Sequence, residues 1–163
     1  MVLVGAVDLG EDPLALDRQV CFALSVASRN VIALYRPLLA PMGLTHPQYL
    51  VMLALWERSP RSVKDLCATL HAEAATLSPL LKRLEAIGYV VRPRSRTDER
   101  QLAVDLTDAG RALRAEAEKI PYRVVELLGM ELADLERLNT ALGQVIAATK
   151  RALDGPGASA TTG

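Results

Sequence analysis

Residues 90–110 read VVRPRSRTDERQLAVDLTDAG, and this stretch decides the fold. Two short runs of β-type residues flank a polar segment that holds Arg94, Arg96 and Arg100. This pattern predicts two antiparallel strands joined by a basic tip. Residues 82–100 carry six basic and three acidic side chains, so positive charge gathers at the hairpin and just before it.

The sequence before the hairpin predicts four helices. Apolar residues recur at helical spacing over residues 14–38, and this first helix tolerates Pro37 near its end. A second helix is predicted over residues 45–58, because Thr45 can cap it and Gln48 can complete a capping box.

The next two helices are short and separated by a tight turn. They are predicted over residues 62–70 and 73–88, the first starting at Ser62 and the second ending at Gly88, a favourable C-cap. After the hairpin, one helix capped by Thr107 is expected over residues 107–128, and a last one over residues 132–152. The predicted order is four helices, two strands and two helices.

A helix-turn-helix followed by a two-stranded wing is a module that reads DNA grooves, with its second helix in the major groove. The residues expected to reach the DNA from that helix are Ala74, Ala75, Thr76, Ser78 and Pro79, with Lys82 and Arg83 on phosphates. The wing would add Arg94, Arg96 and Arg100, and Asp98 can brace Arg100 by a charge-assisted hydrogen bond.

A plainer interpretation makes the three wing arginines a solvated charged turn, but the helix pair directly upstream favours the DNA-reading one. The leucines of the reader helix are assigned to its core face. They are Leu77, Leu80, Leu81 and Leu84.

The whole chain has 163 residues, half of them hydrophobic, and no formal net charge. One ordered body is expected over residues 13–153, with flexible tails at residues 1–12 and 154–163. Because charges interrupt every apolar stretch before about 18 residues, a soluble cytoplasmic protein without a membrane partner is expected.

Two cysteines stand 46 positions apart without a CxxC pair, and there are only two histidines. This spacing argues against a disulfide framework and against a structural zinc site. The sequence therefore predicts no metal and no cofactor.

The helices predicted at residues 13–40 and 108–153 carry more apolar surface than the winged module of residues 45–107 can cover. We therefore expect them to pair with a second copy of the chain. A two-fold homodimer suits a palindromic operator in double-stranded DNA.

Cys21 lies on the first predicted helix, where a lone cysteine is usually a small buried hydrophobe. Tyr35 follows fourteen residues later, within about 40° of the same face but roughly 21 Å along the axis. The two side chains cannot touch within one helix. Across a dimer of crossing helices, Tyr35 can donate its hydroxyl to the partner's sulfur and favour the thiolate.

These features together resemble the MarR family of winged-helix regulators, and within it the organic-hydroperoxide-sensing branch, OhrR. The resemblance covers about residues 16–153. The segments that carry the family pattern are residues 80–88, 94–100 and 106–110, and those that carry the branch pattern are residues 21–24, 27–29, 35–39 and 44–50.

The resemblance implies that Cys21 is the peroxidatic sensor, oxidised first to a sulfenic acid, with the partner's Tyr35 as a hydrogen-bond donor. A second donor, a tyrosine in the family, is His46 here, which can still donate but can equally be a surface histidine. The family often has another tyrosine four residues after the cysteine, and that position is Ser25 in this chain. Cys67 does not match the family's resolving cysteine and is read as a core residue.

The leading hypothesis is a DNA-binding repressor that leaves its operator when an organic hydroperoxide oxidises Cys21. The alternative keeps the fold but makes a small phenolic or lipophilic ligand the effector. A cysteine-dependent enzyme using Cys21 and His46 is disfavoured, because no third orienting residue, phosphate loop or acid pair accompanies them.

Overall fold

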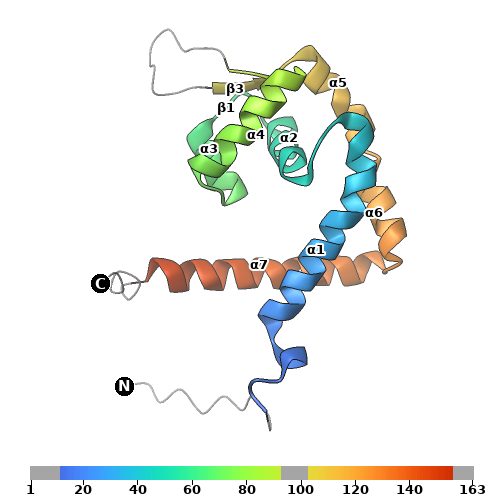
Figure 1. Ribbon diagram of the computed structural model, residues 1–163, viewed down its shortest axis with the longest axis vertical. Coiled ribbons are helices and arrows are strands. Elements are labelled where there is room, and N and C mark those ends of the chain that lie inside the picture. Colours follow the sequence, from blue (N-terminus) through green and yellow to red (C-terminus); the bar gives the residue numbers. More distant parts are fainter. Residues whose placement is uncertain (1–11, 93–102, 156–163) are drawn as a thin grey trace. The chain divides into compact units, whose positions relative to one another are not determined.

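The computed structural model describes residues 12–92 and 103–155 (Figure 1). They form two compact units, residues 1–120 and 121–163, which are described separately. The helices of the first unit are η1 (Leu16–Arg18), α1 (Val20–Leu39), η2 (Ala40–Met42), α2 (His46–Glu57), α3 (Val63–Leu70), α4 (Ala74–Ile87) and α5 (Asp108–Ala117). Its strands are β1 (Arg61–Ser62), β2 (Val90–Val91) and β3 (Ala103–Leu106).

The predicted caps form where short polar side chains precede helices. The Thr45 backbone N–H donates to Gln48 Oε1 (2.9 Å) at the start of α2. The Asp65 N–H donates to Ser62 Oγ (3.1 Å) at the start of α3. At the end of α4, Gly88 adopts a left-handed φ of 94°, a conformation that glycine reaches without strain. The helix boundaries predicted for residues 45–88 are thus confirmed to within two residues.

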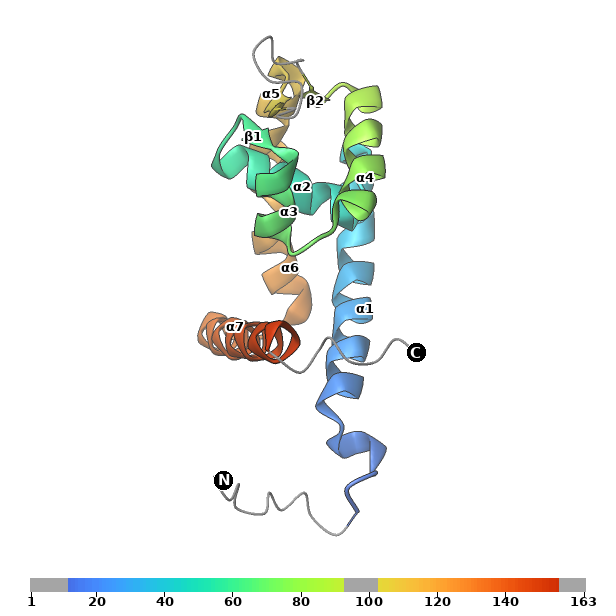
Figure 2. The ribbon, with the colours of Figure 1, turned by 90° about the vertical axis from the view of Figure 1, so that its left-hand side faces the viewer.

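The core of the first unit lies where α2, α3 and α4 pack on one another beside the sheet (Figure 2). Its fully buried side chains come from these elements and from the last residue of α1, and each contributes about 2 kcal/mol by burial. They are Leu39, Val51, Met52, Leu55, Leu66, Leu77, Leu81, Leu84, Val90 and Val104.

The sheet has three strands in the order β1-β3-β2, both pairs antiparallel. Strands β2 and β3 are the predicted hairpin, so the mainly helical winged fold is confirmed. Strand β1 was not predicted. It has two residues, and its partner Val104 lies 43 positions further on, opposite Arg61.

The start of α5 is held against the sheet by a close backbone approach. The Thr107 hydroxyl donates to the Gly88 carbonyl (2.5 Å), and its oxygen accepts from the Gly110 N–H (3.1 Å). A Cβ on Gly110 would lie 2.1 Å from the Tyr89 carbonyl oxygen, so only glycine fits there. The Trp56 indole N–H donates to the Gly110 carbonyl (2.8 Å), which ties α2 to α5.

The second unit contains α7 (Leu132–Asp154) and, apart from its first residue, α6 (Ile120–Leu128). The single helix predicted over residues 107–128 was wrong, because α5 ends at Ala117 and α6 begins at Ile120. Pro121 supplies the reason. It has no N–H to donate to the fourth carbonyl before it, but it fits the first turn of a new helix.

The predicted tails fall outside the described residues, except for residues 12, 154 and 155. Within the described parts of the chain, no single helix is long and apolar enough to cross a membrane. Two consecutive segments, Val20–Met42 and His46–Glu57, pass that test only as a pair, and they are bent by 70°.

Candidate DNA-reading and sensor sites

Helix α4 buries a row of leucines on one face and exposes the other face. Leu77, Leu81 and Leu84 are fully buried, and Leu80 is half-buried, as predicted. The residues predicted to reach DNA are all exposed. They are Ala74, Ala75, Thr76, Ser78, Pro79, Lys82 and Arg83.

The two cations of that face are available for phosphates. In the part of the chain that the structure describes, neither Lys82 nor Arg83 makes an ion pair. Arg92, at the start of the wing, instead pairs with Glu85 of α4 through a 2.9 Å contact. The predicted wing residues Arg94, Arg96, Asp98 and Arg100 lie outside the described residues.

Both cysteines are outside disulfides. Cys21 lies in the first turn of α1 and is exposed, so it is not a buried hydrophobe in this chain. Cys67, predicted as a core residue, is only half-buried on α3. Ser25 is exposed on α1, one turn after Cys21.

Tyr35 and His46 are brought together at the junction of α1 and α2. Their ring centroids lie 5.0 Å apart in a T-shaped arrangement. Tyr49 joins them, 5.8 Å from Tyr35 and 6.5 Å from His46. Trp56 extends the series at 6.5 Å from Tyr49. We call Tyr35, His46, Tyr49 and Trp56 the aromatic cluster.

Burial sets the protonation of this cluster. It raises the pKa of Tyr35 above 10.0, so the phenol keeps its proton and remains a hydrogen-bond donor. It lowers the pKa of His46 below 6.5, so the neutral imidazole is favoured at pH 7. His46 is therefore a half-buried packed residue rather than a surface histidine. His71, by contrast, is exposed.

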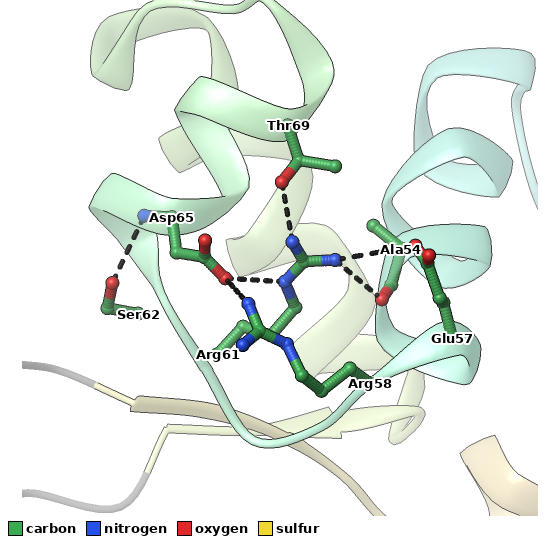
Figure 3. Close-up of polar contacts among 7 residues, drawn as sticks. All are labelled: Ala54, Glu57, Arg58, Arg61, Ser62, Asp65 and Thr69. Atoms are coloured by element: carbon green, nitrogen blue, oxygen red, sulfur yellow. Dashed lines mark hydrogen bonds and ion pairs between the residues drawn. The ribbon is translucent and has the colours of Figure 1, made fainter.

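A buried arginine was missed by the sequence reading. The Arg61 side chain is 6% exposed, and its guanidinium donates to three groups around it (Figure 3). These are the Ala54 carbonyl (3.0 Å), the Asp65 carboxylate (2.6 Å) and the Thr69 hydroxyl (2.5 Å). The sequence did contain a signal for this ion pair, because Arg61 and Asp65 stand four residues apart at the start of a helix.

Arg58 and Glu57 complete this network. Arg58 donates to the same Asp65 oxygen (2.7 Å) from a largely exposed position, and Glu57 lies 3.8 Å from the Arg61 guanidinium. The hydrogen bond from Arg61, supported by the charge of Arg58, lowers the pKa of Asp65 below 3.8. We call these residues, with Thr69, the Arg61 cluster.

Among the described residues, no group of three or more histidine, cysteine, aspartate or glutamate side chains is placed to hold a metal ion. The described geometry is that of a helix pair with an exposed reader face, followed by the two strands of a wing. These features define a winged-helix DNA-binding protein of the transcription-regulator class.

Comparison with known proteins narrows the class to a family. The profile of the family described as "Transcriptional regulator SarA/Rot" matches residues 33–117. The organic hydroperoxide resistance transcriptional regulator of Bacillus subtilis (strain 168) is 39% identical over 131 residues, covering 80% of this chain and 89% of that protein. The chain belongs to the MarR family of winged-helix transcriptional regulators, and the Bacillus relative supports its organic-hydroperoxide-sensing branch.

Two further proteins resemble the chain over most of its length. The HTH-type transcriptional regulator TtmR of Methylorubrum extorquens (strain PA1) is 47% identical over 128 residues. That match covers 78% of this chain but 66% of the relative, just under two thirds of its length. The structure of reduced AbfR bound to DNA, a protein of Staphylococcus epidermidis, has a TM-score of 0.78 and 30% identity, covering 88% of this chain and 99% of that one.

Proposed function

We propose that the chain is a homodimeric repressor that binds a palindromic operator when reduced and leaves it when an organic hydroperoxide oxidises Cys21. The observation that carries the proposal is the exposed Cys21 thiol on α1, a helix that packs little of its own surface. Along α1, every residue of which is described, only Leu39 is buried.

A second copy of the chain can cover these helices. Val20, Phe22 and Ile32 are large apolar side chains exposed on α1. In the unit that contains α7, no residue of that fully described helix is buried. Uncovered apolar faces of this extent are expected on a protomer taken out of its dimer.

The dimer supplies the sensor's missing contacts. Because Cys21 and Tyr35 lie about 21 Å apart along one helix, a Tyr35 hydroxyl reaches the sulfur only from the partner. Its raised pKa keeps that hydroxyl protonated, and a protonated donor stabilises a thiolate by a charge-assisted hydrogen bond. His46 packs on Tyr35 and holds its ring in place.

The oxidation step balances with the hydroperoxide as the oxidant. The Cys21 sulfur attacks one peroxide oxygen, an S–O bond forms and the O–O bond breaks. Sulfur loses two electrons and takes up the OH of the hydroperoxide as a sulfenic acid, while the remaining alkoxide takes the proton that the thiol released and leaves as an alcohol. A low-molecular-weight cellular thiol can then form a mixed disulfide with Cys21 and release water.

Operator binding would use the exposed face of α4 and the wing. Ala74, Ala75, Thr76, Ser78 and Pro79 are proposed for the major groove, and Lys82 and Arg83 for phosphates. Arg94, Arg96 and Arg100, with Asp98 bracing the last, are proposed for the minor groove. Because such a regulator must meet the DNA, we propose that it acts in the cytoplasm.

Two relatives support the redox part of the proposal. The Bacillus protein is named for resistance to organic hydroperoxides. AbfR has been solved with DNA in its reduced and in its overoxidized form, and separately as a disulfide form. We extend redox control from these proteins to this chain on the strength of Cys21 and the aromatic cluster.

The test is fluorescence anisotropy with labelled DNA from upstream of the chain's own gene, before and after equimolar cumene hydroperoxide. Wild type is expected to bind when reduced, to release after oxidation and to rebind after excess thiol. Cys21→Ser is expected to stay bound throughout. If both proteins stay bound in peroxide and a phenolic acid releases them, the ligand-responsive alternative replaces this proposal.

A separate assay, with hydroperoxide in excess over protein and no added thiol, tests whether the protein is an enzyme. One Cys21 consumes one hydroperoxide, so peroxide loss should stop at one equivalent per chain. Continued turnover at substoichiometric protein would instead point to a cysteine-dependent peroxidase.

A further inference from the structure

The Arg61 cluster has no part in the reading or sensing steps described above. We propose that Arg61 is a positioning residue for DNA reading, which fixes the helix pair α3–α4 on the end of α2. The inference rests on the proposed operator binding but not on the proposed response to peroxide.

The Arg61 guanidinium joins the end of α2 to both the first and the last turn of α3. Ala54 belongs to the last turn of α2, Asp65 to the first turn of α3 and Thr69 to its last turn. A planar fork that donates to all three points fixes direction as well as distance (Figure 3). A lysine has one nitrogen and cannot span them.

The backbone of the same residue joins these helices to the wing. Arg61 lies in β1 and pairs with Val104 of β3, the strand that returns from the wing tip. The next residue, Ser62, caps α3. Helix α3 packs on α4, so a change in its angle would move the exposed reader face relative to the wing.

The cost of burying a charge supports this role over simple packing. A guanidinium that is 6% exposed loses most of its hydration, and an apolar side chain of similar volume often stabilises a core at least as well. Arginine adds a defined geometry that methionine lacks. The reader helix α4 and the wing must keep a fixed relative position to contact DNA together, and the hydrogen bonds of Arg61 supply such a fixed geometry.

The test compares Arg61→Met with Arg58→Met, using reduced protein, the same DNA and a series of salt concentrations. Both variants remove a cation that contacts Asp65, but the Arg58 side chain is 66% exposed. With methionine at position 61, the Ala54 carbonyl still has a hydrogen-bond partner, because the backbone N–H of Arg58 also donates to it (3.3 Å). The Arg61 variant should therefore fold.

We expect Arg61→Met to weaken DNA binding about tenfold, the effect of losing a charged hydrogen-bond network, and to leave the salt slope unchanged. Arg58→Met should bind within about threefold of wild type, because exposed ion pairs contribute little. Lys82→Ala is the contrasting variant, since loss of a phosphate contact lowers the salt slope by about one.

Titration at high protein concentration gives the fraction of each preparation that can bind. Wild-type affinity for the competent fraction of Arg61→Met would make its role merely structural and overturn the proposal. A salt slope lowered by about one would also overturn it, since Arg61 would then be a phosphate contact. If Arg61→Met does not fold, Asp65→Asn is measured instead, and wild-type affinity of that variant would reject the proposal.

The peroxide response is recorded on the same wild-type protein. A wild type that binds DNA but ignores peroxide ends the sensor proposal and leaves the Arg61 comparison intact.

Discussion

Gly110 shows how one residue can fix the junction between reader and flanking helix. Its missing side chain lets the first turn of α5 approach the Tyr89 carbonyl, while its own carbonyl accepts from Trp56. In the sequence, this glycine stands out only as part of the family pattern over residues 106–110. The close approach depends on Tyr89, twenty-one positions earlier, so local sequence rules could not reveal it.

Gly110→Ala is therefore expected to destabilise the fold by about 3 kcal/mol, since backbone atoms on both sides must move. The matched control is Gly143→Ala on α7, where an added Cβ meets nothing within 4 Å. That change should be neutral, or stabilising by up to about 1 kcal/mol, because alanine favours helix. Urea unfolding of both variants checks the difference, and equal effects would contradict it.

His46 makes stability depend on pH in a defined direction. Because burial lowers its pKa in the folded state, the unfolded chain binds a proton first as the pH falls below 6.5. Stability is therefore fully present above pH 6.5 and is lost as the pH falls toward the lower folded-state value.

We expect wild type to lose stability relative to His46→Phe between pH 7.5 and pH 5. Urea unfolding at each pH gives the free energies of unfolding, and the pH dependence of the difference between the proteins is the quantity of interest. Identical pH dependence would mean that His46 is hydrated in the folded state.

At the scale of elements, the sequence predicted what local rules control. The caps at Thr45, Ser62 and Thr107 and the glycine end of α4 depend on neighbours within four residues, and all were found. The exposed face of α4 followed from helical periodicity. Strand β1, the aromatic cluster and the Arg61 cluster depend on partners from other elements, and periodicity cannot find them. The break between α5 and α6 did have a local signal, Pro121 itself, which the prediction of one helix over residues 107–128 did not use.

Helix α7 carries a continuous apolar stripe, which we expect to pack against a second helix. Leu135, Leu138, Leu142 and Val145 repeat at alternating spacings of three and four, the pattern of helices that pack side by side. At 23 residues the helix is about 35 Å long, long enough for an extended dimer contact.

Leu138→Asp is expected to shift the protein from dimer to monomer, because an unpaired carboxylate would lie within the apolar contact. Gln144→Glu places a charge about a third of a turn away from Leu138 on the same helix, outside the apolar stripe, and should leave the dimer intact. Sedimentation velocity measures both. A dimeric Leu138→Asp protein would exclude this stripe from the dimer contact.

In the whole molecule, the proposed switch consists of a thiol on α1, the aromatic cluster on α1 and α2, and a reader face on α4. Helix α2 carries three residues of the aromatic cluster, and its last turn contacts the Arg61 cluster, so it belongs to both. Oxidation of Cys21 would release DNA by favouring a dimer arrangement in which the two reader faces no longer match the operator spacing.

The most direct measurement of this claim follows Cys21 and DNA in the same samples. Wild type is titrated with cumene hydroperoxide, and each point is split between intact-mass analysis of Cys21 and anisotropy of the labelled operator. The account predicts that released DNA rises in step with oxidised Cys21 and that Cys21→Ser releases none. Full oxidation of Cys21 with the operator still bound, or release from Cys21→Ser at the same peroxide concentration, would contradict it.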